Sequence, residues 1–147
     1  MLFRSNTSGL DWYEIVIKVY LTSGLLDDFY SKLASGLNEE LQSEIEKALK
    51  DKTFDKFAKR VLSDAISTDP VLASRLAVWG RRLMGDVLLE LRAAFDNRKL
   101  AHVPKSRVLT VEEENKVNLA AYAKLEPLIS ELTGAHSQRM EGLGLNA

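Results

Sequence analysis

One segment, residues 69–97, constrains the fold more than any other part of the chain. It opens with Asp69-Pro70, an N-cap residue followed by a proline at the first helical position, which is a strong signal for a helix start. This pattern predicts one long amphipathic helix over residues 70–96, of the kind that forms the wall of a helical bundle. Its apolar residues recur at spacings of three and four: Leu72, Leu76, Trp79, Leu83, Val87, Leu91 and Phe95.

A second long helix is predicted over residues 11–33. Asp11-Trp-Tyr-Glu14 has the form of a capping box, in which the two end side chains bond to each other's backbone N–H groups. The helical period then selects one face of this helix as the buried one. We expect that face to consist of Trp12, Ile15, Val16, Val19, Phe29 and Leu33.

Two shorter helices are predicted between the long ones. Asn38 is a candidate N-cap and is followed by two acids, which the helix dipole favours at that end. From Phe54 to Ile66 apolar residues follow the i, i+3, i+4, i+7 pattern over three turns, the clearest amphipathic pattern in the chain.

The C-terminal region is also predicted to be helical. Thr110-Val-Glu-Glu113 is a second capping box and opens this region, and Pro127 is expected to kink or split it. Order is expected to end at Gly142 and Gly144. One face of this region carries Leu128, Ile129, Leu132, His136, Met140 and Leu143.

No segment alternates apolar and polar residues as a strand does, so the sequence predicts a single all-α domain over residues 1–147. Residues 1–10 read as a linker-like N-terminus. Residues 98–109 carry basic side chains and no acid, and we interpret them as a basic surface loop.

Charge and cysteine content exclude several classes of protein. The 20 basic and 21 acidic residues give a formal net charge of -1, which provides no electrostatic footprint for nucleic acid or an anionic membrane. The chain has no cysteine, which excludes disulfides, Fe–S clusters and thiolate zinc sites. No uncharged run approaches the roughly 20 residues that a membrane span needs. The cytoplasm is therefore the default compartment.

Helical bundles often hold two iron ions through Glu-x-x-His pairs on facing helices, and this chain contains no such pair. Its only histidines are His102, in the basic loop, and His136, on an apolar helix face. The position of His136 favours a hydrogen-bonded core histidine over a ligand or general base. The candidates for metal ligation, all weak, are Glu14, Asp86 and His136.

Arg82, Asp86 and Glu90 follow one another at four-residue spacing and therefore share a helix face. The simplest interpretation is an exposed ladder of i,i+4 contacts. The alternative is a polar strip inside a bundle, with Asp86 as a remnant ligand carboxylate and a required pairing of Arg82 with Asp86.

Five segments carry a resemblance to a known family: Asp11-Trp-Tyr-Glu14, Gly24-Leu-Leu-Asp-Asp-Phe-Tyr30, Asp69-Pro70, Arg75-Leu-Ala-Val-Trp-Gly-Arg-Arg-Leu83 and Ala135-His-Ser-Gln-Arg-Met-Glu-Gly-Leu-Gly-Leu145. Together they resemble a bacterial family of ferritin-like proteins that is distantly similar to the di-iron hydroxylase acting on 2-methylthio-N6-isopentenyladenosine in tRNA. The resemblance implies a ferritin-like helical bundle and a tRNA-modification context, with tRNA as a possible partner and the pair Arg81-Arg82 as candidate binding residues.

Two departures from that family bear on activity. Relatives carry further helices, one with a Glu/His ligand motif, ahead of the segment that begins here at Asp11, so the chain matches only the C-terminal part of the family. Relatives also carry an acid-x-x-His where this chain reads Asp51-Lys-Thr-Phe54, and phenylalanine cannot ligate iron.

Three hypotheses follow. The first is a ferritin-like bundle without a working di-iron site or other cofactor, acting as a structural or binding module. The second is an oxygen-dependent di-iron hydroxylase completed by helices or a partner outside this chain. The third is an all-α ligand-binding or protein-interaction domain. A partial bundle would leave apolar helix faces uncovered, so we expect pairing with a second copy or another chain.

Overall fold

The computed structural model describes residues 10–146, and within this range the chain forms six α-helices and no strand. The predicted all-α class is therefore confirmed for these residues. None of these helices combines the length and apolar character that a bilayer span requires. The helices are α1 (Leu10–Ala34), α2 (Glu39–Ala48), α3 (Thr53–Thr68), α4 (Pro70–Ala94), α5 (Asn97–Leu100) and α6 (Val111–Glu141).

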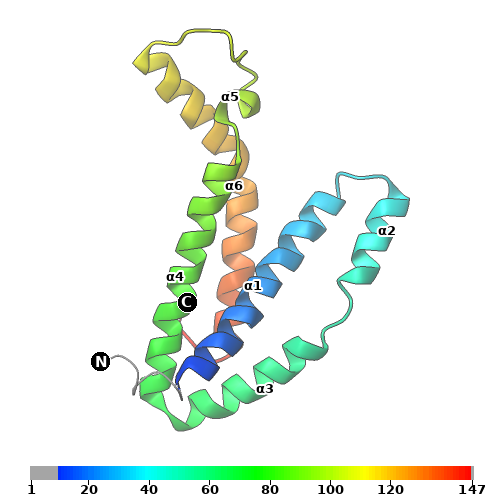
Figure 1. The fold of residues 1–147 in the computed structure, drawn as a ribbon, viewed down its shortest axis with the longest axis vertical. Helices are drawn as coiled ribbons and strands as arrows, with labels where there is room; N and C mark the ends of the chain where they lie inside the picture. The colour runs from blue at the N-terminus through cyan, green and yellow to red at the C-terminus, as the bar shows by residue number, and fades with distance from the viewer. Residues whose placement is uncertain (1–9, 147) are drawn as a thin grey trace.

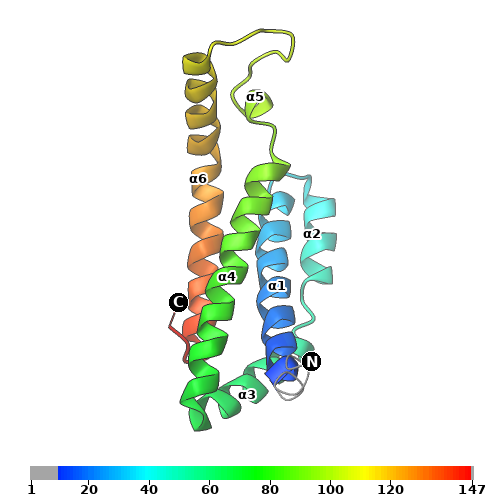
Figure 2. The same ribbon diagram turned by 60° about the vertical axis from the view of Figure 1, so that its left-hand side comes forward.

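Three long helices, α1, α4 and α6, form the body of the molecule (Figure 1). α2 runs back beside the upper part of α1, and α3 crosses from there to the base of α4 (Figures 1 and 2). The upper part of α6 extends beyond α1 and carries α5 against it (Figure 2). This arrangement packs α1 against four other helices: α2, α3, α4 and α6.

Side-chain caps start three of the helices where the sequence predicted them. Asp69 Oδ1 accepts hydrogen bonds from the N–H groups of Val71 and Leu72, each at 3.0 Å, with Pro70 at the first helical position. Thr110 forms the complete capping box at the start of α6, and the Asn38 side chain caps α2. α1 begins at Leu10, one residue before the predicted start, and the side chain of Asp11 lies outside the described residues.

α6 is one continuous helix of 31 residues that passes through Pro127. Of the two outcomes predicted at this proline, a kink or a split, the split does not occur, and the first turns of the helix lean away from the line of the rest, as in a kinked helix (Figure 1). Proline removes only one backbone donor, and buried side chains on both sides of it, Leu125 and Leu132, hold the helix against its neighbours.

The main core lies where α1, α3, α4 and the end of α6 meet. The predicted inner face of α3 is confirmed from Ala58 onward, where Ala58, Leu62 and Ile66 are buried. It is wrong at the start of the helix, where Phe54 and Phe57 are 40% and 42% exposed. The chain also stays ordered past Gly142, contrary to the sequence expectation. Gly144 adopts φ 82°, which an L side chain rarely takes, and this turn places Leu143 and Leu145 in the core.

Two glycines allow α6 to approach its neighbours closely. A Cβ built at Gly80 of α4 would overlap Met140 Sδ, and one at Gly24 of α1 would overlap the Arg139 guanidinium. Gly85 has no neighbouring atom within 4 Å of such a Cβ. A neighbouring side chain therefore packs closely against α4 at Gly80 and not at Gly85.

The basic segment 98–109 differs in two ways from a solvated basic loop. Its first three residues belong to α5, and three of its four basic side chains, those of Arg98, Lys105 and Arg107, are paired with acids on either side. These pairs offset the positive charge that a phosphate group would need. They are Arg98 with Glu114 at 2.9 Å, Arg107 with Glu113 at 2.7 Å, and Lys105 with Asp96 at 3.4 Å.

The predicted buried side of α1 is largely wrong. Val16 is buried and Phe29 is half-buried, but Trp12, Ile15, Val19 and Leu33 are each 45–58% exposed. The reason is that α1 carries apolar residues on two opposite faces, and only one of them is covered. Periodicity alone could not show which face that is.

Candidate interaction surface on the first helix

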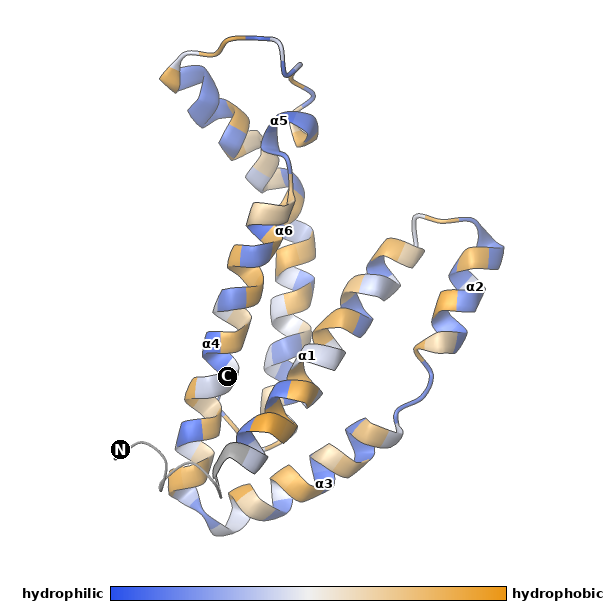
Figure 3. Ribbon diagram, in the orientation of Figure 1, coloured by the Kyte–Doolittle hydropathy of each residue, from blue (hydrophilic) through white to orange (hydrophobic). Residues whose placement is uncertain are grey.

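The uncovered face of α1 is an apolar stripe along the whole helix. Six residues form this outer stripe, and the apolar character of α1 is visible along its length in Figure 3. An exposed apolar residue alone needs no explanation, but a contiguous row of this kind marks an interaction site. The outer stripe consists of Trp12 (46% exposed), Ile15 (58%), Val19 (45%), Leu26 (46%), Tyr30 (48%) and Leu33 (51%).

The outer stripe lies opposite the buried face of the same helix. Ile17 and Leu21 are fully buried, and Gly24 lies against Arg139 of α6. With about 100° of rotation per residue, Val19 and Leu26 lie on the other side of the helix from these three residues. A helix that is apolar all round is normally covered on all sides, so the stripe has the composition of a buried surface.

A groove of about 430 Å³ adjoins the stripe between α1 and α4. Leu26 belongs to both features. Thr22 also lines the groove, and its buried Oγ1 has no hydrogen-bond partner among the described residues. The remaining lining is mostly apolar and comes from three helices: Leu25 and Phe29 of α1, Asp86, Val87, Glu90, Leu91 and Ala94 of α4, and Leu132 of α6.

Asp86 and Glu90 are the only charged residues in this lining. Both are exposed, and neither forms an ion pair with any residue in the described range. The predicted ladder with Arg82 is therefore exposed as expected, but its i,i+4 ion pairs are not formed. Asp86 is not a buried carboxylate paired with Arg82.

The candidate metal ligands do not come together. Glu14 of α1 pairs with Arg75 at 3.2 Å, Asp86 borders the groove, and His136 lies in the core of the bundle. Within residues 10–146, no group of three His, Asp or Glu side chains is placed to hold a metal ion. The described residues therefore do not fit a di-iron centre by themselves.

The helical architecture agrees with a comparison against known families. A family model described as a ferritin-like domain of actinomycetes matches residues 2–103, which include α1 to α5. The chain belongs to this ferritin-like family. No curated protein matches it.

In this ferritin-like domain His136 is a core residue. It is 3% exposed, and its Nε2 donates to the carbonyl of Gly80 at 3.1 Å, which ties α6 to α4. Burial lowers the pKa of His136, the hydrogen bond to Gly80 opposes that effect, and the charge of Arg139 adds to it. The imidazole is therefore neutral, in agreement with the core role that the sequence favoured.

The candidate binding residues Arg81 and Arg82 are both exposed. Arg81 is engaged within the domain, because its Nη1 donates to the carbonyl of Asn146 at 2.7 Å. Arg82 lines a shallow hollow together with Glu14, Arg75 and Trp79. The pair therefore divides into one arginine that holds the C-terminal segment and one that faces solvent.

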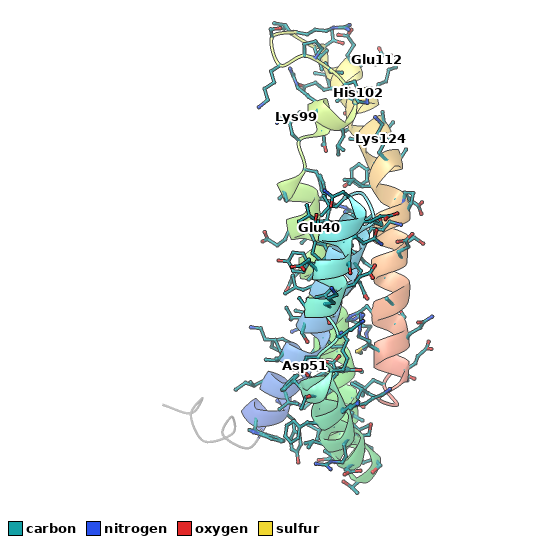
Figure 4. The ribbon with its side chains drawn as sticks, turned by 90° about the vertical axis from the view of Figure 1, so that its right-hand side faces the viewer. Glu40, Asp51, Lys99, His102, Glu112 and Lys124 are labelled. Carbon is teal, nitrogen blue, oxygen red and sulfur yellow. The ribbon has the colours of Figure 1, made fainter. Side chains whose placement is uncertain are left out.

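The remaining acid and histidine singled out by the sequence are far apart in the ferritin-like domain. Asp51 accepts a hydrogen bond from the N–H of Thr53 at the start of α3. Hydrogen bonding with the Thr53 side chain, and after it the bond from the Thr53 N–H, lowers the pKa of the Asp51 carboxyl. His102 lies at the other end of the molecule, near Lys99 and Lys124 (Figure 4). Phe54, where relatives are expected to carry histidine, is 40% exposed.

The outer stripe was not identified from the sequence, although a signal for it exists. Trp12, Val19, Leu26 and Leu33 follow a strict seven-residue repeat, which is typical of a helix that packs against another helix. The sequence predicts that three of these residues, Trp12, Val19 and Leu33, are buried, whereas all four lie on the surface.

Proposed function

We propose that this ferritin-like domain is a binding module that docks another helical surface on the outer stripe of α1. The observation that carries the proposal is the exposure of six apolar side chains in one row on a helix whose opposite face is already buried. Leaving such a row in water is unfavourable by about 25 cal/mol for each Å² of apolar surface. A partner helix laid along the stripe would remove this cost, as in other complexes where an amphipathic helix fills an apolar groove.

A second candidate is an oxygen-dependent di-iron hydroxylase completed from outside this chain. Asp86 and Glu90 favour it, because two carboxylates one helical turn apart, without ion-pair partners in the described range, border a groove. Di-iron sites of this fold need histidine ligands as well, and His136 is hydrogen-bonded to the carbonyl of Gly80. A tRNA substrate would follow only from this second candidate, with Arg82 as the solvent-facing contact.

Three measurements on the full chain test the two candidates. We expect sedimentation velocity to show association of the chain. If the chain is monomeric, we expect it to bind an apolar dye such as ANS. Association and dye binding should each be reduced in Leu26→Lys. The matched control is Leu89→Lys, an equally drastic change at a residue that is 64% exposed on α4 and outside both the stripe and the groove. A monomer that binds no dye would overturn the binding module.

Metal analysis addresses the hydroxylase. We expect no stoichiometric iron in freshly purified protein. Iron that is present in a fixed ratio, and is lost in Asp86→Asn but retained in Leu89→Lys, would establish the second candidate instead.

A further inference from the structure

The outer stripe of α1 has the same spacing in both directions. From Trp12 to Leu33 its residues are separated by 3, 4, 7, 4 and 3 positions. We propose that the stripe pairs with the stripe of a second copy, the two α1 helices running antiparallel about a twofold axis between Thr22 and Ser23. This inference rests on the proposed function, since it names the occupant of the same surface.

The palindromic spacing makes the stripe complementary to itself. In a twofold interface residue i contacts j of the other copy and j contacts i, so an antiparallel helix pair requires positions symmetric about one centre. The six stripe residues meet this condition without exception. The resulting layers are Trp12 against Leu33, Ile15 against Tyr30, and Val19 against Leu26, each occurring twice.

Side-chain size favours the antiparallel over the parallel arrangement. Each antiparallel layer combines residues of different size, such as Trp12 with Leu33, so that large and small side chains alternate. A parallel pair would place Trp12 on Trp12 and Tyr30 on Tyr30. The helix dipoles also favour this arrangement, because antiparallel dipoles side by side attract each other and parallel ones repel.

The centre of the stripe is the point where two backbones could approach most closely. Thr22 and Ser23 lie on either side of the proposed axis, among the six residues that separate Val19 from Leu26, and both side chains are small. Small residues at a crossing point let helices pack at the short end of the usual range of about 8–10 Å.

No unpaired charge of α1 obstructs the contact. From residue 12 onward every charged side chain of the helix is engaged within its own chain, so the stripe presents an apolar surface without like-charge repulsion. The contacts are Glu14 with Arg75, Lys18 over the Trp79 ring, Asp27 with Lys52, Asp28 with Arg139 and Lys32 with Glu131.

The area is sufficient for a dimer of modest affinity. Six side chains that are about half exposed present on the order of 80 Å² each, which gives about 1,000 Å² for two copies, the lower bound for a specific interface. Sedimentation velocity over a range of protein concentrations measures the dissociation constant, which the area alone does not fix.

Single-cysteine cross-linking of the full chain tests the geometry, and the absence of native cysteine gives a clean background. We expect Ser23→Cys to cross-link to its own copy with a short bis-maleimide, because the residue lies beside the axis. Trp12→Cys should not, since antiparallel copies place these positions about 30 Å apart at 1.5 Å per residue. A mixture of Trp12→Cys and Leu33→Cys should give the mixed product.

Charge substitution provides an independent readout. Leu26→Lys should raise the dimer dissociation constant at least tenfold, and Leu89→Lys should leave it within twofold. Self-cross-linking of Trp12→Cys would mean a parallel pair and would overturn the inference while the binding module stands. A monomer that binds dye would likewise overturn the antiparallel dimer and leave the binding module standing. A monomer that binds no dye would overturn both the dimer and the binding module.

Discussion

Two glycines of α4 provide a quantitative test of how α6 packs against this helix, because alanine at each position should change the free energy of unfolding differently. Gly80 and Gly85 both lie inside α4, so replacing either by alanine gains the same intrinsic helix propensity, about 1 kcal/mol. Gly85 is exposed and a Cβ there would meet nothing within 4 Å. We therefore expect Gly85→Ala to raise the free energy of unfolding by about 0.5–1 kcal/mol.

Gly80→Ala adds a methyl group to occupied space. The new Cβ would overlap the end of the Met140 side chain, which is fully buried, and would lie 3.3 Å from Leu21 Cδ1. Overpacking of a core costs about 1–3 kcal/mol, which opposes the gain in propensity. The expected result is a change between about zero and 2 kcal/mol destabilising, and the difference from Gly85→Ala isolates the tertiary cost.

Urea unfolding of the two variants, followed by far-UV circular dichroism, measures this difference. Met140→Ala supplies a further check, because shortening that side chain should cost about 2–5 kcal/mol in the wild type. In the Gly80→Ala background the same change should cost less, by a coupling of about 0.5–3 kcal/mol. If Gly80→Ala stabilises the protein as much as Gly85→Ala, Met140 does not fill that space and the described packing of α6 is wrong.

Three further outcomes are expected. The pKa of His136 is lower in the folded protein than its ordinary value of 6.5, so the free energy of unfolding should fall as pH drops below that value, by at most about 1.4 kcal/mol per pH unit. Urea unfolding of His136→Gln at a series of pH values should show a smaller dependence of this free energy on pH, and an unchanged dependence would refute the buried neutral state. Asp69→Ala should cost about 1 kcal/mol in urea unfolding, and Asp69→Ser should retain most of the cap. Asp28→Asn should lower the free energy of unfolding by about 1–2 kcal/mol, since it leaves the largely buried Arg139 guanidinium without its carboxylate, and a neutral result would place that pair in solvent.

Features with a local cause could be predicted from the sequence. The caps at Asp69 and Thr110 depend on side chains two or three residues from the groups that they bond, and both are confirmed. The inner face of α3 could also be predicted from the sequence, because only one side of that helix is apolar. The core position of His136 followed from its place in the apolar row of α6.

The orientation of α1 could not be predicted in this way. Val19 and Ile17 are both apolar, two residues apart and on opposite faces, yet only Ile17 is covered. Which face is covered depends on where α3, α4 and α6 lie, and that is a property of the whole fold. The same limit applies to Leu145, whose short segment after Gly144 has no periodicity that would predict burial.

The turn at Gly144 has a consequence for the order of events during synthesis. Leu143 and Leu145 complete a core whose other members come mainly from α1, α3 and α4, all made much earlier. The N-terminal helices can therefore form as they emerge from the ribosome, but this core is complete only once residues 143–145 have also emerged.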